Sequence, residues 1–121
     1  MWASFSPDDQ LIATVGREQL IRIYSSHDFQ EQHRLEGHRS TIYRVIFSPD
    51  NQQVVTASAD ATIRFWDLSN DSELFALNLP AQSAYSVPLR DFDFRCTPSG
   101  CWIAVPLTRG KLALYELGMV Y

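Results

Sequence analysis

A repeated turn and a fixed spacing most constrain what this chain can fold into. Phe5-Ser6-Pro7-Asp8 recurs as Phe47-Ser48-Pro49-Asp50, 42 residues later, and Thr97-Pro98-Ser99 follows after another 49. An aromatic residue stands 17 positions after each proline, at Tyr24, Trp66 and Tyr115. Self-similarity at such a period indicates stacked copies of one supersecondary unit.

Each copy is expected to be made of short strands, because β-branched and aromatic runs alternate with turn residues. The first copy predicts strands at 2–5, 11–15, 20–24 and 29–35, and the second predicts them at 41–47, 53–58, 62–67 and 73–79. The third predicts 90–96, 102–107 and 112–117. Pro106 lacks a backbone N–H, so we expect a bulge in its strand.

The second copy carries the motifs of a known family: Gly37-His38, Ser48-Pro49-Asp50, Ser58-Ala59-Asp60 and Trp66-Asp67. With these residues in order, the chain resembles the WD-repeat (WD40) β-propeller family over nearly all its length. The resemblance implies an all-β fold of four-stranded antiparallel blades, forming an incomplete ring of about three blades. The implied blades are residues 1–36, residues 37–79 as the complete one, and residues 80–121, divergent and without an outer strand.

The resemblance also implies a structural hydrogen-bond chain within the second blade. Its members would be His38, Ser58, Asp60 and Trp66, with Thr56, on the same strand face, as the alternative to Ser58. A buried indole N–H needs an acceptor, and an imidazole can accept at one nitrogen while it donates at the other. The outer copies lack this set, so we expect packing to hold them.

His38, Asp60 and Ser58 also include the residue types of a hydrolase triad. A nucleophile needs an exposed oxygen, whereas this serine lies within a strand, so we expect no catalytic residue and no enzyme activity. The histidines are too scattered for a metal site, and no cofactor is expected. Cys96 and Cys101 are interpreted as reduced packing thiols, with a disulfide across their hairpin as the alternative.

Charge and hydropathy limit the partners. The net charge is −4 with scattered basic residues, which argues against nucleic acid and anionic membranes. No apolar run approaches the roughly 20 residues that cross a bilayer, and the N-terminus has no signal-peptide pattern. We therefore expect a cytoplasmic protein.

Three blades do not close a ring, since propellers have typically four to eight. The cut ends are expected to present apolar faces. We predict Val15, Ile21 and Ile23 at one end, and Phe92, Phe94, Ile103 and Leu114 at the other. The chain should therefore form a homo-oligomer or pair with a complementing propeller chain.

The predicted function is a non-catalytic protein–protein interaction scaffold, because loops on a rigid frame carry recognition. The expected protein-binding residues are Arg17, Arg39, Ser40, Tyr43, Ala59 and Thr108. The alternative is the sensor or regulatory propeller portion of a larger signalling NTPase or caspase-like protein. The chain itself has no phosphate-binding Gly-Lys-Ser/Thr loop.

Overall fold

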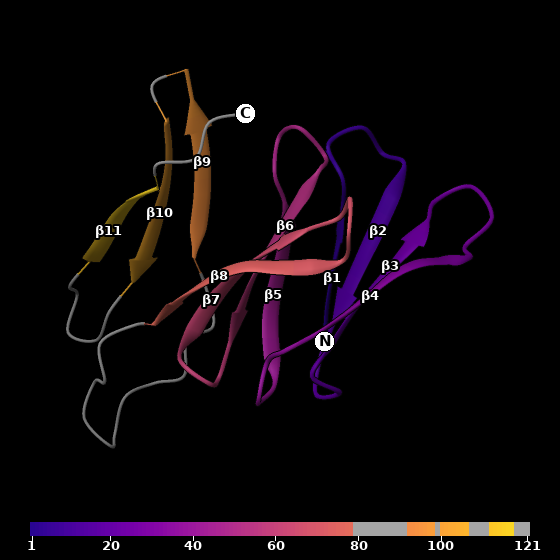
Figure 1. Ribbon diagram of the computed structural model, residues 1–121, viewed down its shortest axis with the longest axis horizontal. Coiled ribbons are helices and arrows are strands. Elements are labelled where there is room, and N and C mark those ends of the chain that lie inside the picture. The colour runs from indigo at the N-terminus through magenta and orange to yellow at the C-terminus, as the bar shows by residue number, and fades with distance from the viewer. Residues whose placement is uncertain (79–91, 99, 107–111, 118–121) are drawn as a thin grey trace.

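The computed structural model describes residues 1–78, 92–98, 100–106 and 112–117, and its regular elements are all strands, in three antiparallel sheets (Figure 1). The first sheet has the order β1 (Trp2–Phe5), β2 (Leu11–Val15), β3 (Leu20–Ser25) and β4 (Glu31–Glu36). The second has the order β5 (Ile42–Phe47), β6 (Gln53–Ser58), β7 (Thr62–Asp67) and β8 (Ser72–Asn78). The third has the order β11 (Leu112–Leu117), β10 (Gly100–Pro106) and β9 (Asp93–Thr97). The prediction of an all-β fold of incomplete propeller blades is confirmed.

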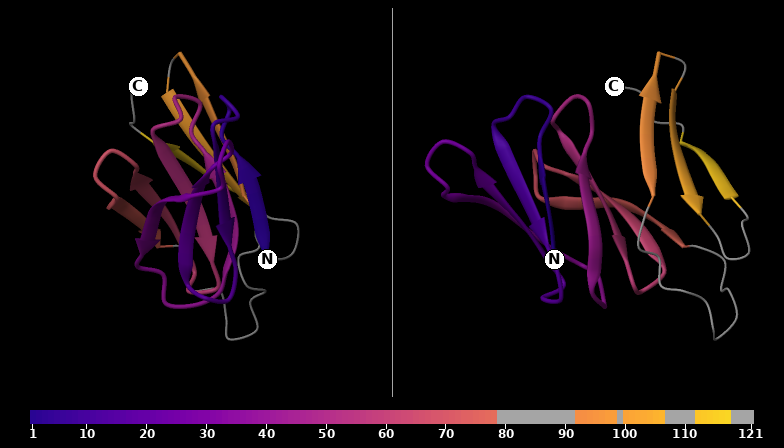
Figure 2. Two further views of the ribbon diagram at one scale, coloured as in Figure 1. Left: turned by 90° about the vertical axis from the view of Figure 1, so that its right-hand side faces the viewer. Right: turned by 180° about the vertical axis from the view of Figure 1, so that it is seen from behind.

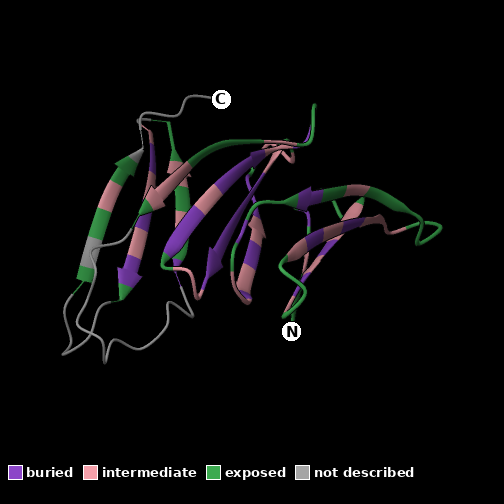
Figure 3. Ribbon diagram, turned by 60° about the horizontal axis from the view of Figure 1, so that its bottom comes forward, coloured by how far each residue is buried: buried purple, intermediate pink, exposed green. Residues whose placement is uncertain are grey.

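The three sheets pack face to face and are arranged radially, with the second sheet in the middle (Figures 1 and 2). One apolar cluster joins the first and second sheets and includes Ile21, Ile23, Val54 and Trp66. Another joins the second and third sheets and includes Val55, Phe65 and Ile103. Buried positions gather on β2, β3, β5, β6, β7 and β10, whereas the turns and the strands β1, β4, β8 and β9 are mostly more exposed (Figure 3). Each sheet is thus stabilised mainly by its neighbour's face.

The structure corrects the predicted end faces. Six of the seven residues predicted there face inward: Val15, Ile21 and Ile23 pack toward the second sheet, as do Phe92, Phe94 and Ile103 from the other side. Leu114, the seventh, is 60% exposed. Side chains alternate across a strand, so the outward face of the first sheet carries the residues between the buried ones, such as Ile12 and Tyr24. The prediction had assigned residues that point toward the second sheet to the outward faces of the end sheets.

The strand bounds differ from prediction most at β9, which begins three residues later than expected, and β4 begins two residues later. Phe29 has a φ of 57°, and the turn closes with a bond from the Ser25 N–H to the Gln30 carbonyl, at 2.9 Å. Pro106 also differs, because it lies at the end of β10, opposite Leu112, and the recorded pairings of β10 show no register shift. A proline at a strand end removes little from the ladder, so no bulge is needed.

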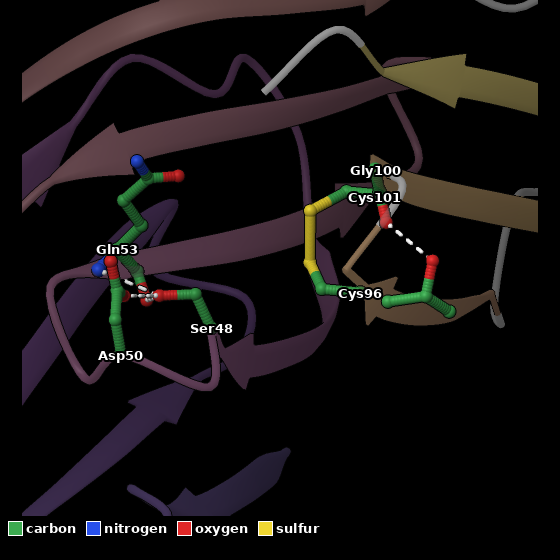
Figure 4. The surroundings of a disulfide bond; sticks show 7 residues. Ser48, Asp50, Gln53, Cys96, Gly100 and Cys101 are labelled. Carbon is green, nitrogen blue, oxygen red and sulfur yellow. Dashed lines mark hydrogen bonds between the residues drawn. A yellow bond between two sulfur atoms is a disulfide. The ribbon is translucent and has the colours of Figure 1, made fainter. Parts of the chain in front are cut away.

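The repeated Ser-Pro-Asp turns have the same construction in the first two sheets. The buried Ser6 and Ser48 hydroxyls accept from the N–H groups of Leu11 and Gln53, each at 3.0 Å, and donate to the aspartate two residues later. Figure 4 includes the second of these turns. In each of the two sheets the serine closes the turn that precedes a strand, β2 in the first and β6 in the second. This shared role explains why the motif recurs.

Cys96 and Cys101 form a disulfide, contrary to the expectation of reduced thiols (Figure 4). They are direct partners in the register of β9 and β10, so their side chains share one face of the hairpin. The bridge closes over the turn at the tip of the third sheet.

Arg44, on β5, connects all three sheets near their inner strands. Its guanidinium carbon lies 5.4 Å from the ring centre of Trp2 and 5.3 Å from that of Phe92, and it donates a hydrogen bond to the Phe92 carbonyl. A cation between two aromatic rings is attracted to both. Among the described residues, no helix is long and apolar enough to cross a membrane.

Candidate functional site

A buried polar chain crosses the face of the second sheet that packs against the first. The His38 Nδ1 atom lies 3.0 Å from Asp60 Oδ2, and its Nε2 atom lies 2.6 Å from Thr56 Oγ1. The Trp66 indole N–H donates to the same Thr56 oxygen at 2.9 Å. A carboxylate only accepts, so Nδ1 carries the imidazole proton. The bonds then run in one direction: Trp66 donates to Thr56, Thr56 to His38, and His38 to Asp60.

The linking hydroxyl belongs to Thr56 rather than to Ser58. Ser58 is fully buried on the same strand, but its hydroxyl donates to the Thr41 carbonyl at 2.9 Å and accepts from the Asp60 N–H at 3.1 Å. Ser58 therefore fixes the turn that presents Asp60. The structure brings His38, Asp60 and Trp66 together and leaves Ser58 in this supporting position.

Asp60 gathers several donors, and these decide its ionisation. Burial would raise the pKa of this carboxyl, but hydrogen bonds from the Thr62 hydroxyl, the Arg39 N–H and His38 outweigh it and lower the pKa from 3.8 to about 2. Burial lowers the pKa of His38 below its usual 6.5, although Asp60 opposes that shift. At neutral pH the pair is thus a neutral imidazole beside a carboxylate.

A glycine is required at position 37 because the backbone there lies close to the Trp66 indole. A Cβ atom at this position would lie 2.8 Å from Cη2 of Trp66, closer than side-chain carbons pack. Gly37 and His38 together therefore lie against the indole, and the His38 and Trp66 ring centres are 6.0 Å apart. Gly37 and His38 together cover the buried polar groups on this face of the second sheet.

This chain of groups suits a structural role rather than catalysis. The His38 side chain is 0% exposed and that of Asp60 is 10% exposed, so a substrate cannot reach the imidazole. Among the residues that the structure describes, the hydroxyl next to the imidazole is that of Thr56, which is buried and already bonded on both sides, so it is not available as a nucleophile. No group of three or more His, Cys, Asp or Glu in the described part of the chain is placed to hold a metal ion.

The predicted protein-binding residues gather in part at one edge of the first two sheets. The Ile42 N–H donates to the Gly16 carbonyl at 3.0 Å, which joins the turn carrying Arg17 to the segment carrying Arg39. Both arginines are exposed, while Ser40, Tyr43 and Ala59 are half-buried. Tyr43 lies within β5 rather than in a loop. Thr108 lies outside the described residues.

The ion pairs of the second sheet are repeated in the first, although the sequence interpretation expected packing alone to hold the first copy. Arg22 pairs with Glu18 at 3.0 Å and approaches Glu31 at 3.8 Å. In the second sheet, 42 residues on, Arg64 pairs with Glu73 at 2.6 Å and lies 3.9 Å from Asp60. The 42-residue spacing relates Arg22 to Arg64 and Glu31 to Glu73, and following these two pairs would have predicted the repeated ion pairs.

Residues 29–67, which include β4 to β7, match the family described as WD domain, G-beta repeat. Over 76 residues the chain is 37% identical to the Serine-threonine kinase receptor-associated protein of Gallus gallus, covering 62% of this chain and 21% of that protein. It is 32% identical over 91 residues to the Transcriptional corepressor LEUNIG_HOMOLOG of Arabidopsis thaliana, a match that covers 75% of this chain and 11% of that protein. It is 33% identical over 78 residues to WD repeat-containing protein 1 of Gallus gallus, a match that covers 62% of this chain and 13% of that protein.

Radially packed antiparallel sheets with a His–Asp–Thr–Trp chain between them define blades of a β-propeller. With the matching repeat at residues 29–67 and relatives of that type, the chain belongs to the WD-repeat family. It spans between 11% and 21% of the length of the three relatives described above.

Proposed function

We propose that this chain is a non-catalytic protein–protein interaction scaffold, part of a larger or oligomeric propeller. The observation that carries the proposal is an edge, next to the buried polar chain, that holds the exposed side chains of Arg17 and Arg39. The buried polar chain fixes the turn at Asp60, which in turn binds the Arg39 N–H at 3.0 Å. Arg17 is held close by through the Gly16 carbonyl. Arginine on a fixed backbone is a favoured interface anchor.

The outer faces of the end sheets support the idea of a larger assembly. On the third sheet Leu112 is 66% exposed and Leu114 is 60% exposed. Covering the exposed parts of these two leucines would contribute roughly 2–4 kcal/mol, taking about 1.5–3 kcal/mol for complete burial of each. We infer that a second copy or a complementing propeller chain covers them. The acidic net charge favours a protein partner over nucleic acid or membrane.

The alternative, a sensor or regulatory propeller portion of a larger signalling NTPase or caspase-like protein, stays a prediction. No contact among the described residues favours it. It would use the same frame and the same edge, and would differ only in what lies beyond residues 1–121.

The scaffold function is tested by cross-linked capture of protein partners on the purified chain. The variant Arg17→Gln/Arg39→Gln should lose partners that the wild type retains. Arg34→Gln makes the same change on the outer strand β4, where Arg34 pairs with Glu31, and should keep them. If all three proteins capture the same partners equally, the arginine edge is not the binding surface.

Assembly is tested by light scattering of the wild type and of Leu114→Glu. We expect the wild type to be larger than its monomer mass of 13.8 kDa and the variant to be smaller than the wild type. A stable wild-type monomer would contradict the argument from the outer faces.

A further inference from the structure

The disulfide closes a strand pairing that is two residues shorter than the corresponding pairings in the other two sheets. In those sheets, the phenylalanine just before the turn pairs with a residue seven positions later: Phe5 with Ile12, and Phe47 with Val54. Cys96 holds the same place, two residues before Pro98, but it pairs with Cys101, five positions later (Figure 4). The pairing of β9 with β10 therefore departs from the repeat.

The pairing of β10 with β11 does not depart from it. Ile103 stands five residues after the turn proline and pairs with Tyr115 on β11. The residues at the same place in the other sheets have the same partners: Ile12 pairs with Tyr24, and Val54 with Trp66. β10 and β11 thus keep the register of the first two sheets, which we call the common register, and β9 is displaced by two residues relative to them.

The sequence of the third turn nevertheless suits the longer turn of the common register. Two residues after the turn proline, Asp9 and Asn51 have φ values of 61° and 64°, which lie in the left-handed region. Gly100 stands at this place, and glycine adopts such a conformation most readily. Thr97 supplies a hydroxyl where the other turns have serine, and it now donates to the Gly100 carbonyl at 3.3 Å. In the common register it would accept from the Trp102 N–H, as the serines accept five residues on.

The packing between the second and third sheets also suits the common register. A slip of two residues moves β9 by roughly 7 Å and leaves each side chain on the same face. Cys96 would come opposite Ile103, and Phe94 would reach the level that Phe92 now holds. Arg44, which now contacts the Phe92 ring, would then meet another phenylalanine ring. The inward side chains concerned all belong to one apolar cluster, so an apolar group replaces an apolar group.

The disulfide and the common register exclude each other. In the common register, Cys101 would lie in the turn, diagonally across from Cys96. Diagonal neighbours in a sheet are about 7–8 Å apart, which is beyond the usual reach of a disulfide. We propose that Cys96 and Cys101 form a redox switch: as a disulfide they hold β9 two residues out of the common register, and as a dithiol they release it into that register. This regulation goes beyond the scaffold function and does not depend on what the arginine edge binds.

The conversion is thiol–disulfide exchange with a dithiol reductant. Cys96 is half-buried, whereas Cys101 is 1% exposed, so a thiolate of the reductant attacks the Cys96 Sγ atom. Cys101 leaves as a thiolate and takes up a proton. The second thiol of the reductant then displaces Cys96, which is protonated in turn. The protein gains two electrons and two protons while the reductant becomes a disulfide, and a disulfide oxidant reverses the exchange.

The test compares the full chain in oxidised glutathione with the same chain in dithiothreitol. Thiol titration should find no free thiol in the first and two in the second. Nuclear Overhauser contacts between backbone protons should place Phe94 opposite Ile103 in the oxidised protein and Cys96 opposite Ile103 in the reduced one. The contact of Trp102 with Glu116, across β10 and β11, is the control and should stay in both.

Two variants separate the slip from the reduction itself. Cys96→Ser/Cys101→Ser should show the common register with or without reductant. Thr97→Val should weaken the contact of residue 96 with Ile103 severalfold in the reduced protein, because the longer turn loses its hydroxyl, and should leave the oxidised contacts unchanged. The proposal is overturned if Phe94 stays opposite Ile103 after reduction, if reduction also removes the control contact, or if no bridge forms in oxidised glutathione. Partner capture through Arg39 would be unaffected by any of these results.

Discussion

Replacing Thr56 with valine tests the buried polar chain most directly. The two side chains have similar volume, so the change removes one hydroxyl without opening a cavity. That hydroxyl accepts from the Trp66 indole at 2.9 Å and bonds His38 Nε2 at 2.6 Å. In Thr56→Val both buried partners lose their hydrogen bonds at once.

The expected cost follows from those two unsatisfied atoms. A buried donor or acceptor left without a partner costs about 1–3 kcal/mol, so two of them cost roughly 2–6 kcal/mol. For a chain of this size each 1 kcal/mol lowers the melting temperature by about 4 °C, so we expect a decrease of roughly 8–24 °C. Ser58→Ala removes bonds to two backbone groups near the sheet edge and should cost about 1–2 kcal/mol.

The assay is urea and thermal unfolding of the wild type, Thr56→Val, Ser58→Ala and Thr14→Val. Thr14 is the matched control, because it stands at the equivalent place in the first sheet, where no histidine bonds it, and its change should stay within about 0.5 kcal/mol. The reasoning is refuted if Ser58→Ala costs as much as Thr56→Val, or if Thr14→Val does.

Lowering the pH should remove the part of the unfolding free energy that comes from the Asp60 carboxylate. The pKa of Asp60 falls from 3.8 to about 2 on folding, so its contribution is complete above about pH 4 and disappears as pH falls toward 2. We expect the difference in unfolding free energy between wild type and Asp60→Asn to shrink by about 1–2 kcal/mol from pH 5 to pH 2.5 in urea titrations, and a constant difference would contradict the assignment. Arg44→Lys keeps the charge but loses the planar group between Trp2 and Phe92, and should cost about 1–2 kcal/mol with a change in Trp2 fluorescence. Wild-type stability and fluorescence in that variant would show that the stacking contributes nothing.

The strands could be predicted from the sequence because their determinants are local. Alternating β-branched residues and the Ser-Pro-Asp turns set most strand bounds within a residue or two, and the matched spacing set the repeat. The turn serines are repeated because each hydroxyl closes its own turn, at Leu11 and at Gln53. Such contacts join residues five apart, which a sequence pattern can represent.

The identity of the linking hydroxyl was not accessible in this way. Thr56 and Ser58 lie two residues apart on one strand, so both point to the same face of the sheet. Which of them meets His38 depends on how deeply the segment from Gly37 descends onto Trp66, and this is a long-range contact. The disulfide was missed for a related reason, since the in-register pairing of Cys96 with Cys101 depends on the turn between them.

The error over the end faces has a consequence for how the chain associates. The inward set of the first sheet is small and apolar, as in Ala13 and Val15, and it covers the polar chain of the second sheet. The outward set of the first sheet instead repeats that polar chain, with Thr14 and Arg22 in corresponding places. In the first two sheets one face is therefore apolar and the other carries these polar residues, and the apolar face of the first sheet packs against the polar chain of the second. The third sheet differs, because Ile103 and Val105 meet the apolar face of the second sheet. The outward face of the first sheet thus carries a hydroxyl at Thr14 and a charge at Arg22, and an association through this face alone would have to satisfy polar groups as well as bury apolar ones.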